Sequence, residues 1–151
     1  MTGPLRRSAT MTIQTTGYAH VRITVRDIAR SREFYDSVFG FPVAVELPAD
    51  ADEATREQMW FLFGGVIYQI PGGALFGLRP MAPESDTFDE NRVGLDHLSF
   101  SVGTVADLEA ASAHLDSLSI KHEGVKDIGM GHLLEFRDPD GIALELFAPA
   151  Q

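Results

Sequence analysis

The chain has 151 residues and a formal net charge of −10, with 44% hydrophobic and 23% charged residues. This length suits one domain, or two small similar halves that share a core. The acidic balance disfavours nucleic acid as a partner, because phosphate binding needs clustered Lys and Arg. The sequence contains no cysteine, which excludes a disulfide framework, and no apolar run of the length that a membrane span needs.

The first half predicts a strand, a helix and then three strands. Residues 1–16 are expected to form a loosely ordered tail. No apolar stretch follows Arg6 and Arg7, so no secretory signal is expected. From His20 onward, the segment Tyr18–Arg26 alternates apolar and polar residues, as a strand with one buried face does. Asp27 is a suitable N-cap for a helix over Ile28–Phe39. Strands are expected over Phe41–Leu47 and twice within Gln58–Arg79, with an acidic loop or short helical turn over Pro48–Glu57.

The second half repeats this order, with His97 at the position that corresponds to His20. A strand is expected over Leu95–Val102, a helix from a cap at Thr104 or Asp107 to about Ser119, and strands over Ile120–Lys126, Leu133–Arg137 and Ile142–Phe147. An internal duplication is the simplest explanation. It divides the chain into a first βαβββ module over residues 17–80, a connector over residues 81–93, and a second βαβββ module over residues 94–151.

The closing hairpin carries a carboxylate that needs a partner. In the last strand, Leu144 and Leu146 share one face, and Glu145 lies on the other face with Phe147. Burying an unpaired carboxylate is costly, and the two histidines could meet it around a metal. Aligning the strands 74–80 and 143–149 adds Phe76 to this polar face. A face that mixes aromatic rings with His and Glu favours a half-dry cleft, although plain solvent exposure is the alternative.

These residues resemble the vicinal oxygen chelate superfamily, which includes glyoxalases, extradiol dioxygenases, fosfomycin-resistance thiol transferases, acyl-CoA epimerases and bleomycin-binding proteins. The similar segments are residues 20–27, 31–41, 96–102 and 136–145, and the resemblance extends over about residues 17–149. It implies an α+β fold in which two βαβββ modules form a curved mixed sheet around a metal cleft. It also implies a cytoplasmic homodimer.

Carried over position by position, the resemblance implies that His20, His97 and Glu145 hold one divalent metal. Two imidazoles and one carboxylate suit Fe(II), with Mn(II), Zn(II), Co(II) and Ni(II) as competitors. Glyoxalases and epimerases have a fourth ligand, Glu or Gln, on the last strand of the first module. Here that position is Phe76, or Gly77 if the alignment shifts by one residue, and neither side chain can bind a metal. Three ligands leave room for a bidentate substrate and O₂.

Further candidates come from neighbouring positions. Glu135 stands where extradiol dioxygenases have a tyrosine; it is a general base, an additional ligand, or a surface carboxylate paired with Arg137 or Lys126. His132 is either a proton donor at the mouth of the cleft or an ordinary loop residue. The side chains expected to bind substrate are Arg22, Ser99, Phe76 and Phe147, and Arg22 would neutralise an anionic substrate or pair with a cleft carboxylate.

We therefore expect a metal-dependent enzyme that binds a small substrate through two adjacent oxygens, with dioxygenase-like Fe(II) chemistry. One alternative is a metal-assisted isomerase or lyase, or a thiol transferase, with Glu135 as the base. Another is a non-catalytic ligand-binding protein of the bleomycin-resistance type, which the acidity of the chain favours. No nucleic acid or membrane partner is expected.

Overall fold

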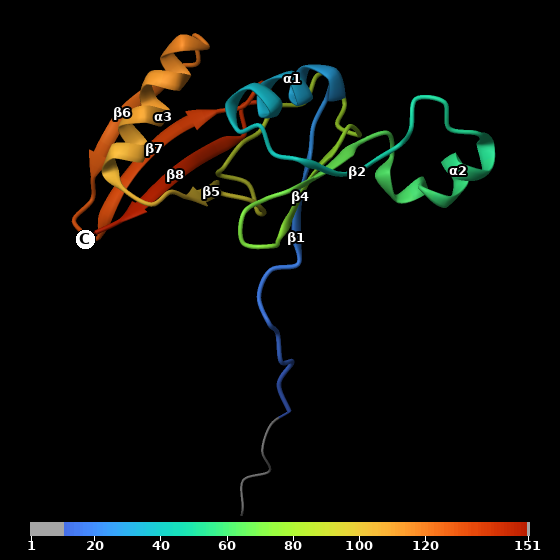
Figure 1. The fold of residues 1–151 in the computed structure, drawn as a ribbon, viewed down its shortest axis with the longest axis horizontal. Coiled ribbons are helices and arrows are strands. Elements are labelled where there is room, and N and C mark those ends of the chain that lie inside the picture. Colours follow the sequence, from blue (N-terminus) through green and yellow to red (C-terminus); the bar gives the residue numbers. More distant parts are fainter. Residues whose placement is uncertain (1–10, 151) are drawn as a thin grey trace, which may run out of the picture.

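The computed structural model describes residues 11–150, so residues 1–10 of the predicted tail lie outside the described part. Two four-stranded sheets form the molecule (Figure 1). The first sheet has the order β1-β4-β3-β2 and contains β1 (His20–Thr24), β2 (Val43–Glu46), β3 (Val66–Gln69) and β4 (Leu75–Arg79). The second sheet has the order β5-β8-β7-β6 and contains β5 (Leu98–Ser101), β6 (His122–Asp127), β7 (Gly131–Arg137) and β8 (Ala143–Pro149).

Both sheets follow one plan, which confirms the duplicated βαβββ fold. In each, the first strand runs parallel to the last and the other neighbours are antiparallel. The long helices are α1 (Ile28–Val38) and α3 (Val105–Ser117). Only the first half carries a helical insertion between its second and third strands, formed by α2 (Glu53–Gln58) and the 3-10 turn η1 (Trp60–Leu62). Because of this insertion, the third strand begins later in the first half than in the second. The insertion lies at the opposite end of the molecule from α3 (Figure 1).

Local sequence signals explain where the long helices begin. The Asp27 side chain accepts a hydrogen bond from the Arg30 backbone N–H, as an N-cap does. Thr104 and Asp107 form a capping box, in which each side chain accepts from the backbone N–H of the other. Both residues that were candidates for the second cap therefore act at that helix end. Within residues 11–150, none of the helices has the length and apolar character that crossing a bilayer requires.

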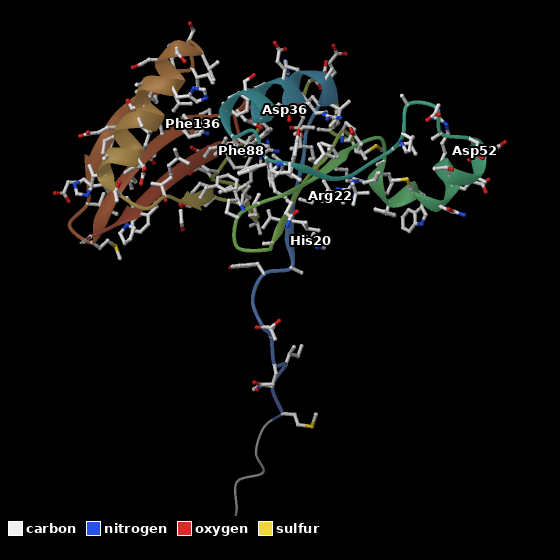
Figure 2. All side chains as sticks on the ribbon, in the orientation of Figure 1. His20, Arg22, Asp36, Asp52, Phe88 and Phe136 are labelled. Carbon is white, nitrogen blue, oxygen red and sulfur yellow. The ribbon has the colours of Figure 1, made fainter. Side chains whose placement is uncertain are left out.

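The hydrophobic core runs through both halves of the chain. Leu144 and Leu146 of β8 are buried, as the alternation of this strand predicts. Helix α1 lies against β4, and it also places Phe34 against Phe136 of β7, with ring centroids 6.4 Å apart. One helix thus contacts both sheets, so the modules share their apolar interior (Figure 2).

The turn that closes the last hairpin joins the two modules through polar contacts. The Tyr35 hydroxyl of α1 donates to Asp138 Oδ2 over 3.0 Å, in a buried position. Arg26 Nε and Arg30 Nη2 contact Asp140 Oδ1 at 2.6 and 3.0 Å. Burial raises the pKa of Asp138, while the hydrogen bonds that its carboxylate accepts oppose this shift. The turn predicted around Pro139 therefore anchors the second module to the first.

Candidate functional site

Three polar side chains share one face of the second sheet. Glu145 of β8 pairs in register with Ser99 of β5 on one side and with Glu135 of β7 on the other. The Ser99 hydroxyl donates to Glu145 Oε1 over 2.6 Å. The second carboxylate oxygen, Oε2, lies 3.8 Å from Nε2 of His97, just before β5. The structure therefore brings together the histidine and the carboxylate that the sequence predicts for this half.

A neighbouring carboxylate orients the imidazole of His97. The Nδ1 atom of His97 lies 2.5 Å from Asp96 Oδ1. In the neutral imidazole this contact favours a proton on Nδ1, which leaves Nε2 as the nitrogen that can bind a metal. The hydrogen bond to Asp96 also raises the pKa of His97, with a smaller contribution from Glu145, against the effect of burial. Asp96 was not among the predicted site residues, although its position next to His97 was a usable signal.

A cleft of about 510 Å³, called here the His97 cleft, is lined by Asp96, His97, Glu135 and Glu145, whereas Ser99 and Phe147 lie outside its lining. Its lining includes the carboxylates Glu90, Asp96, Glu123, Glu135 and Glu145, and the cations Lys121 and Arg137. Carboxylates thus outnumber the permanent cations, which favours accumulation of positive ions in the cleft. Glu90 and Lys121 were not among the predicted site residues, because residues in loops and at strand ends carry no periodic pattern.

His20 lies apart from this cleft. It begins β1 in the first sheet, where it pairs in register with Leu75, and it is exposed (Figure 2). It is absent from the lining of the His97 cleft. Among residues 11–150, no three His, Cys, Asp or Glu side chains are grouped so that they could hold a metal ion. One chain therefore assembles two of the three predicted ligands and keeps the third in the other module.

Strand register identifies the counterpart of Glu145 in the first module. Glu145 pairs with Ser99, and the residue that corresponds to Ser99 in the first module is Arg22. Arg22 pairs with Gly77. Gly77 is therefore the counterpart of Glu145, and the first module has no side chain at the fourth ligand position.

The prediction that Phe76 lines the cleft is wrong. Phe76 is 1% exposed and packs against Tyr35 and Phe100, with ring centroids 5.1 and 5.8 Å away. The alignment of the two proline-terminated strands was shifted by one residue, and such a shift moves every side chain to the opposite face of a sheet. Phe76 is a core residue.

Arg22 shares the face of His20 but serves the insertion of the first module. Its Nη1 and Nη2 atoms donate to the carbonyl oxygens of Phe61 and Leu62 over 2.5 and 2.6 Å. Burial, and secondarily the charge of Arg79, lower the pKa of Arg22. The expected pairing with a cleft carboxylate is not found, because the guanidinium holds the η1 turn on the first sheet.

Glu135 lines the cleft and has an ion-pair partner. Its Oε2 atom lies 3.1 Å from Lys126 Nζ, which is one of the two pairings considered for a surface carboxylate. Arg137, the other expected partner, instead forms two hydrogen bonds with Glu90. Glu135 and Glu145 face each other in register. Two carboxylates so placed repel each other unless a cation lies near them.

His132 and Phe147 lie in different surroundings. His132 is on the face of β7 opposite to Glu135, with Nε2 3.7 Å from Asp127 Oδ2, and it lines a separate hollow beside the start of α3. The structure does not bring His132 into the His97 cleft. Phe147 is on the same face of β8 as Glu145 and is partly buried, as alternation predicts.

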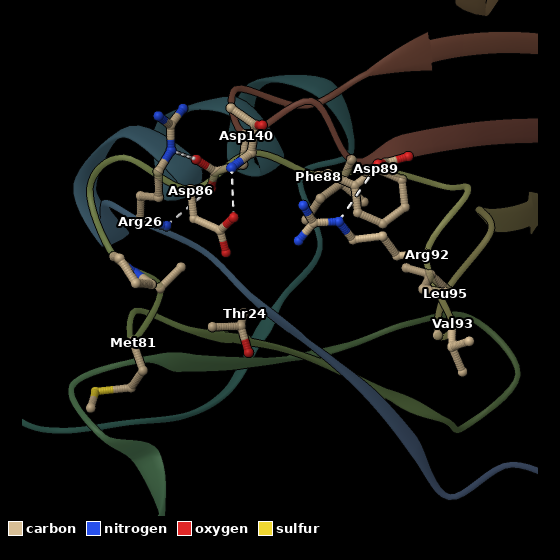
Figure 3. Close-up of a pocket in the computed structure, with 15 residues that line it drawn as sticks. Thr24, Arg26, Met81, Asp86, Phe88, Asp89, Arg92, Val93, Leu95 and Asp140 are labelled. Atoms are coloured by element: carbon tan, nitrogen blue, oxygen red, sulfur yellow. Dashed lines mark hydrogen bonds and ion pairs between the residues drawn. The ribbon is translucent and has the colours of Figure 1, made fainter.

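Another hollow, of about 370 Å³, lies between β1 and the connector (Figure 3). Its wall contains the ion pair of Arg26 with Asp140 and a more exposed pair of Arg92 with Asp89, 3.6 Å apart. The cations in this hollow are thus already paired with carboxylates. It also contains no histidine, and we assign the candidate site to the His97 cleft.

Comparisons with known proteins agree with this geometry. The sequence profile described as "Glyoxalase/Bleomycin resistance protein/Dioxygenase superfamily" matches residues 17–146. The uncharacterized protein YaeR of Escherichia coli (strain K12) is 32% identical over 130 residues, which cover 85% of this chain and 92% of YaeR.

Solved structures share the fold. A glyoxylase/bleomycin resistance protein/dioxygenase domain from Frankia sp. EAN1pec has a TM-score of 0.74 and 30% identity, covering 91% of this chain and 95% of that chain. A mutant form of the fosfomycin resistance protein FosX from Listeria monocytogenes, complexed with Mn(II) and 1S,2S-dihydroxypropylphosphonic acid, has a TM-score of 0.65 and 14% identity. This similarity covers 91% of this chain and 93% of that chain.

Proposed function

Because the chain belongs to the glyoxalase/bleomycin resistance protein/dioxygenase superfamily, we propose that it is a divalent-metal-dependent enzyme. Its substrate is a small molecule that binds through two adjacent oxygen atoms. The observation that carries this proposal is the pair formed by His97 and Glu145. The ligand of FosX, a phosphonic acid with hydroxyls on adjacent carbons, supports the substrate class.

The chemistry of this pair fits a metal ion. Nε2 of His97 presents a lone pair, and its distance of 3.8 Å from Glu145 Oε2 is longer than a hydrogen bond. Each donor group is held from behind by another residue: Asp96 holds the imidazole and Ser99 holds the carboxylate. Such supporting hydrogen bonds are typical of metal ligands.

The third ligand in this proposal is His20 of a second copy of the chain. His20 lies outside the His97 cleft of its own chain, so a homodimer would have to pair the first module of one copy with the second module of the other. The charges support this pairing, because Arg22 and Arg79 lie in the first sheet and carboxylates predominate in the cleft. Two imidazoles and one carboxylate favour Fe(II), with Mn(II), Zn(II), Co(II) and Ni(II) as competitors.

The residues of the cleft then have separate roles. A bound divalent ion supplies Lewis-acid polarisation of the two substrate oxygens and, if it is Fe(II), a means to use O₂. Glu135, opposite Glu145, accepts a proton from the substrate, and Lys126 holds this carboxylate in place. Phe147 lies on the same face of β8 as Glu145 but outside the lining of the cleft, so no role in the cleft is given to it. We place the enzyme in the cytoplasm.

Two other functions remain in competition. An isomerase or lyase, or a thiol transferase, would use the same ligands with Glu135 as base and would not consume O₂. A non-catalytic ligand-binding protein is favoured by one observation, that a single chain groups only two of the predicted ligands within residues 11–150.

Metal analysis and a mixing experiment test the proposal. We expect about one divalent ion per chain after purification without chelator, and its loss in His97→Ala and in Glu145→Gln. His20→Ala alone and His97→Ala alone should both bind no metal. After mixed refolding, half of the sites in each heterodimer should regain metal, because one cleft then has all three ligands. Failure of the mixture to bind would exclude a site shared between copies.

Oxygen consumption separates the enzymatic alternatives. The Fe(II)-loaded protein is supplied with catechol-type substrates in a sealed oxygen electrode, with Glu145→Gln as the control. Consumption that depends on Glu145 supports the dioxygenase. Conversion of a substrate without O₂ uptake supports the isomerase or lyase, and metal-independent ligand binding supports the non-catalytic protein.

A further inference from the structure

Arg137 stands on the same side of the second sheet as the proposed metal ligands. It lies two residues after Glu135 on β7 and pairs in register with Ala143, which lies two residues before Glu145 on β8. Side chains two residues apart on a strand point the same way and are separated by about 7 Å. Arg137 and Glu145 are thus diagonal neighbours on adjacent strands, with backbone positions roughly 7–8 Å apart, and Arg137 lies beside a residue with only a methyl side chain.

The guanidinium of Arg137 is already bound to a carboxylate. Its Nη1 atom donates to Glu90 Oε2 over 3.1 Å, and Nη2 donates to Glu90 Oε1 over 2.5 Å. Nη1 also donates to the carbonyl oxygen of Gly141 over 2.9 Å, which fixes the orientation of the planar group. Two parallel bonds from arginine to one carboxylate are the arrangement with which proteins recognise anionic ligands.

Glu90 can leave this position at low cost. It belongs to the connector, and residues 80–97 form no helix or strand. The side chains of Arg137 and Glu90 are 50% and 36% exposed, and ion pairs with such exposure add little to stability. Lys121 also lines the cleft and has no ion-pair partner within residues 11–150. An entering anion would thus find one oriented guanidinium and one unpaired ammonium.

We propose that Arg137 is an anion subsite of the His97 cleft, that Glu90 occupies it as an internal carboxylate, and that the substrate displaces Glu90 with an anionic group of its own. The substrate class is then a compound with two adjacent oxygens at one end and a carboxylate at the other. The chelating end rests on the proposed function, whereas the anion subsite is formed by residues that need no metal.

Matched acid and ester probes test the subsite. Calorimetry of the full-length, Zn(II)-loaded protein compares 3,4-dihydroxyphenylacetate with its methyl ester, because Zn(II) binds catechol oxygens without redox chemistry. We expect the acid to bind about tenfold more tightly than the ester, as loss of a charge-assisted hydrogen bond implies. Glu90→Gln should strengthen binding of the acid alone. Arg137→Gln should remove the preference for the acid, and Arg137→Lys should restore only part of it.

A second measurement tests the anion subsite in the absence of metal. In metal-free Glu90→Gln protein, the Nε–H signal of Arg137 in a ¹⁵N spectrum should shift with the acid and not with the ester. If Zn(II) does not bind but this signal shifts, the proposed function is wrong and the anion subsite stands. If Zn(II) binds while acid and ester bind equally in every variant, and the signal does not shift, the subsite is overturned and the metal function stands. Circular dichroism checks that each variant is folded.

Discussion

The side chain of Arg22 lies directly over Gly77, with its Cγ atom 3.0 Å from the position that a Cβ on this glycine would take. Glu145, the counterpart of Gly77, extends its carboxylate into the corresponding space of the second sheet. The first module therefore uses this space for a structural arginine, which holds the η1 turn through the carbonyl oxygens of Phe61 and Leu62. A side chain at position 77 would therefore crowd Arg22.

We expect Gly77→Ala to destabilise the protein by about 1–3 kcal/mol, as overpacking of a filled site does. The added methyl group would push Arg22 away from η1. Urea unfolding monitored by the fluorescence of Trp60 measures this loss. In an Arg22→Ala background, the same glycine substitution should cost much less, because the side chain that it displaces is absent. An equal cost in both backgrounds would show that Arg22 is not the obstacle.

Asp96→Asn should lower the pKa of His97, because the hydrogen bond to the Asp96 carboxylate is the main cause of the raised value. A histidine whose pKa is raised by folding stabilises the native state at pH values below about 6.5, its usual value. This contribution is lost as the pH rises through the raised value. An NMR titration of the metal-free protein measures the shift, with His97→Gln to assign the signal.

The same substitution should weaken metal binding about tenfold, since the supporting carboxylate orients the imidazole. Competition with a chromogenic chelator measures this affinity at a pH where His97 is neutral in both proteins. Ser99→Ala serves as the matched variant on the carboxylate side and should also weaken binding. Unchanged affinity in Asp96→Asn would mean that Asp96 does not position the ligand.

Tyr35→Phe should cost about 1–3 kcal/mol, because it removes a hydrogen bond to the buried Asp138 carboxylate. Burial already raises the pKa of Asp138, and losing this donor should raise it further. A carboxyl group with a raised native pKa makes stability fall as the pH increases from its usual value of about 3.9 through the raised value. The variant should therefore lose more stability across this range than the wild type.

Urea midpoints at several pH values test this dependence. Tyr68→Phe is a suitable control, because the Tyr68 hydroxyl donates to Asp36, a carboxylate that is 49% exposed and can be solvated by water instead. The control should show the smaller loss and little additional pH dependence. A pH dependence equal in both variants would contradict the role given to Asp138.

The sequence predicted the parts of the structure that local chemistry determines. Alternation placed Leu144 and Glu145 on opposite faces, and Asp27 began the helix that it was expected to cap. The resemblance supplied the pairing of His97 with Glu145. The position of His20 relative to this pair could not be read from sequence, because it depends on how whole modules pack. The prediction for the face of Phe76 was wrong because the two strands were aligned by their terminal prolines. A terminal proline marks the end of a strand, whereas the register with a neighbouring strand determines which face each side chain takes.

The ion pairs of Arg26 and Arg30 with Asp140 affect the thermal unfolding of the two modules. Each module has its own sheet and long helix, so the two modules could in principle unfold at different temperatures. The ion pairs between the modules, together with the aromatic core that they share, couple the unfolding of one module to that of the other. Scanning calorimetry should therefore give a single unfolding peak, with equal calorimetric and van't Hoff enthalpies. Asp140→Ala should split or broaden this peak.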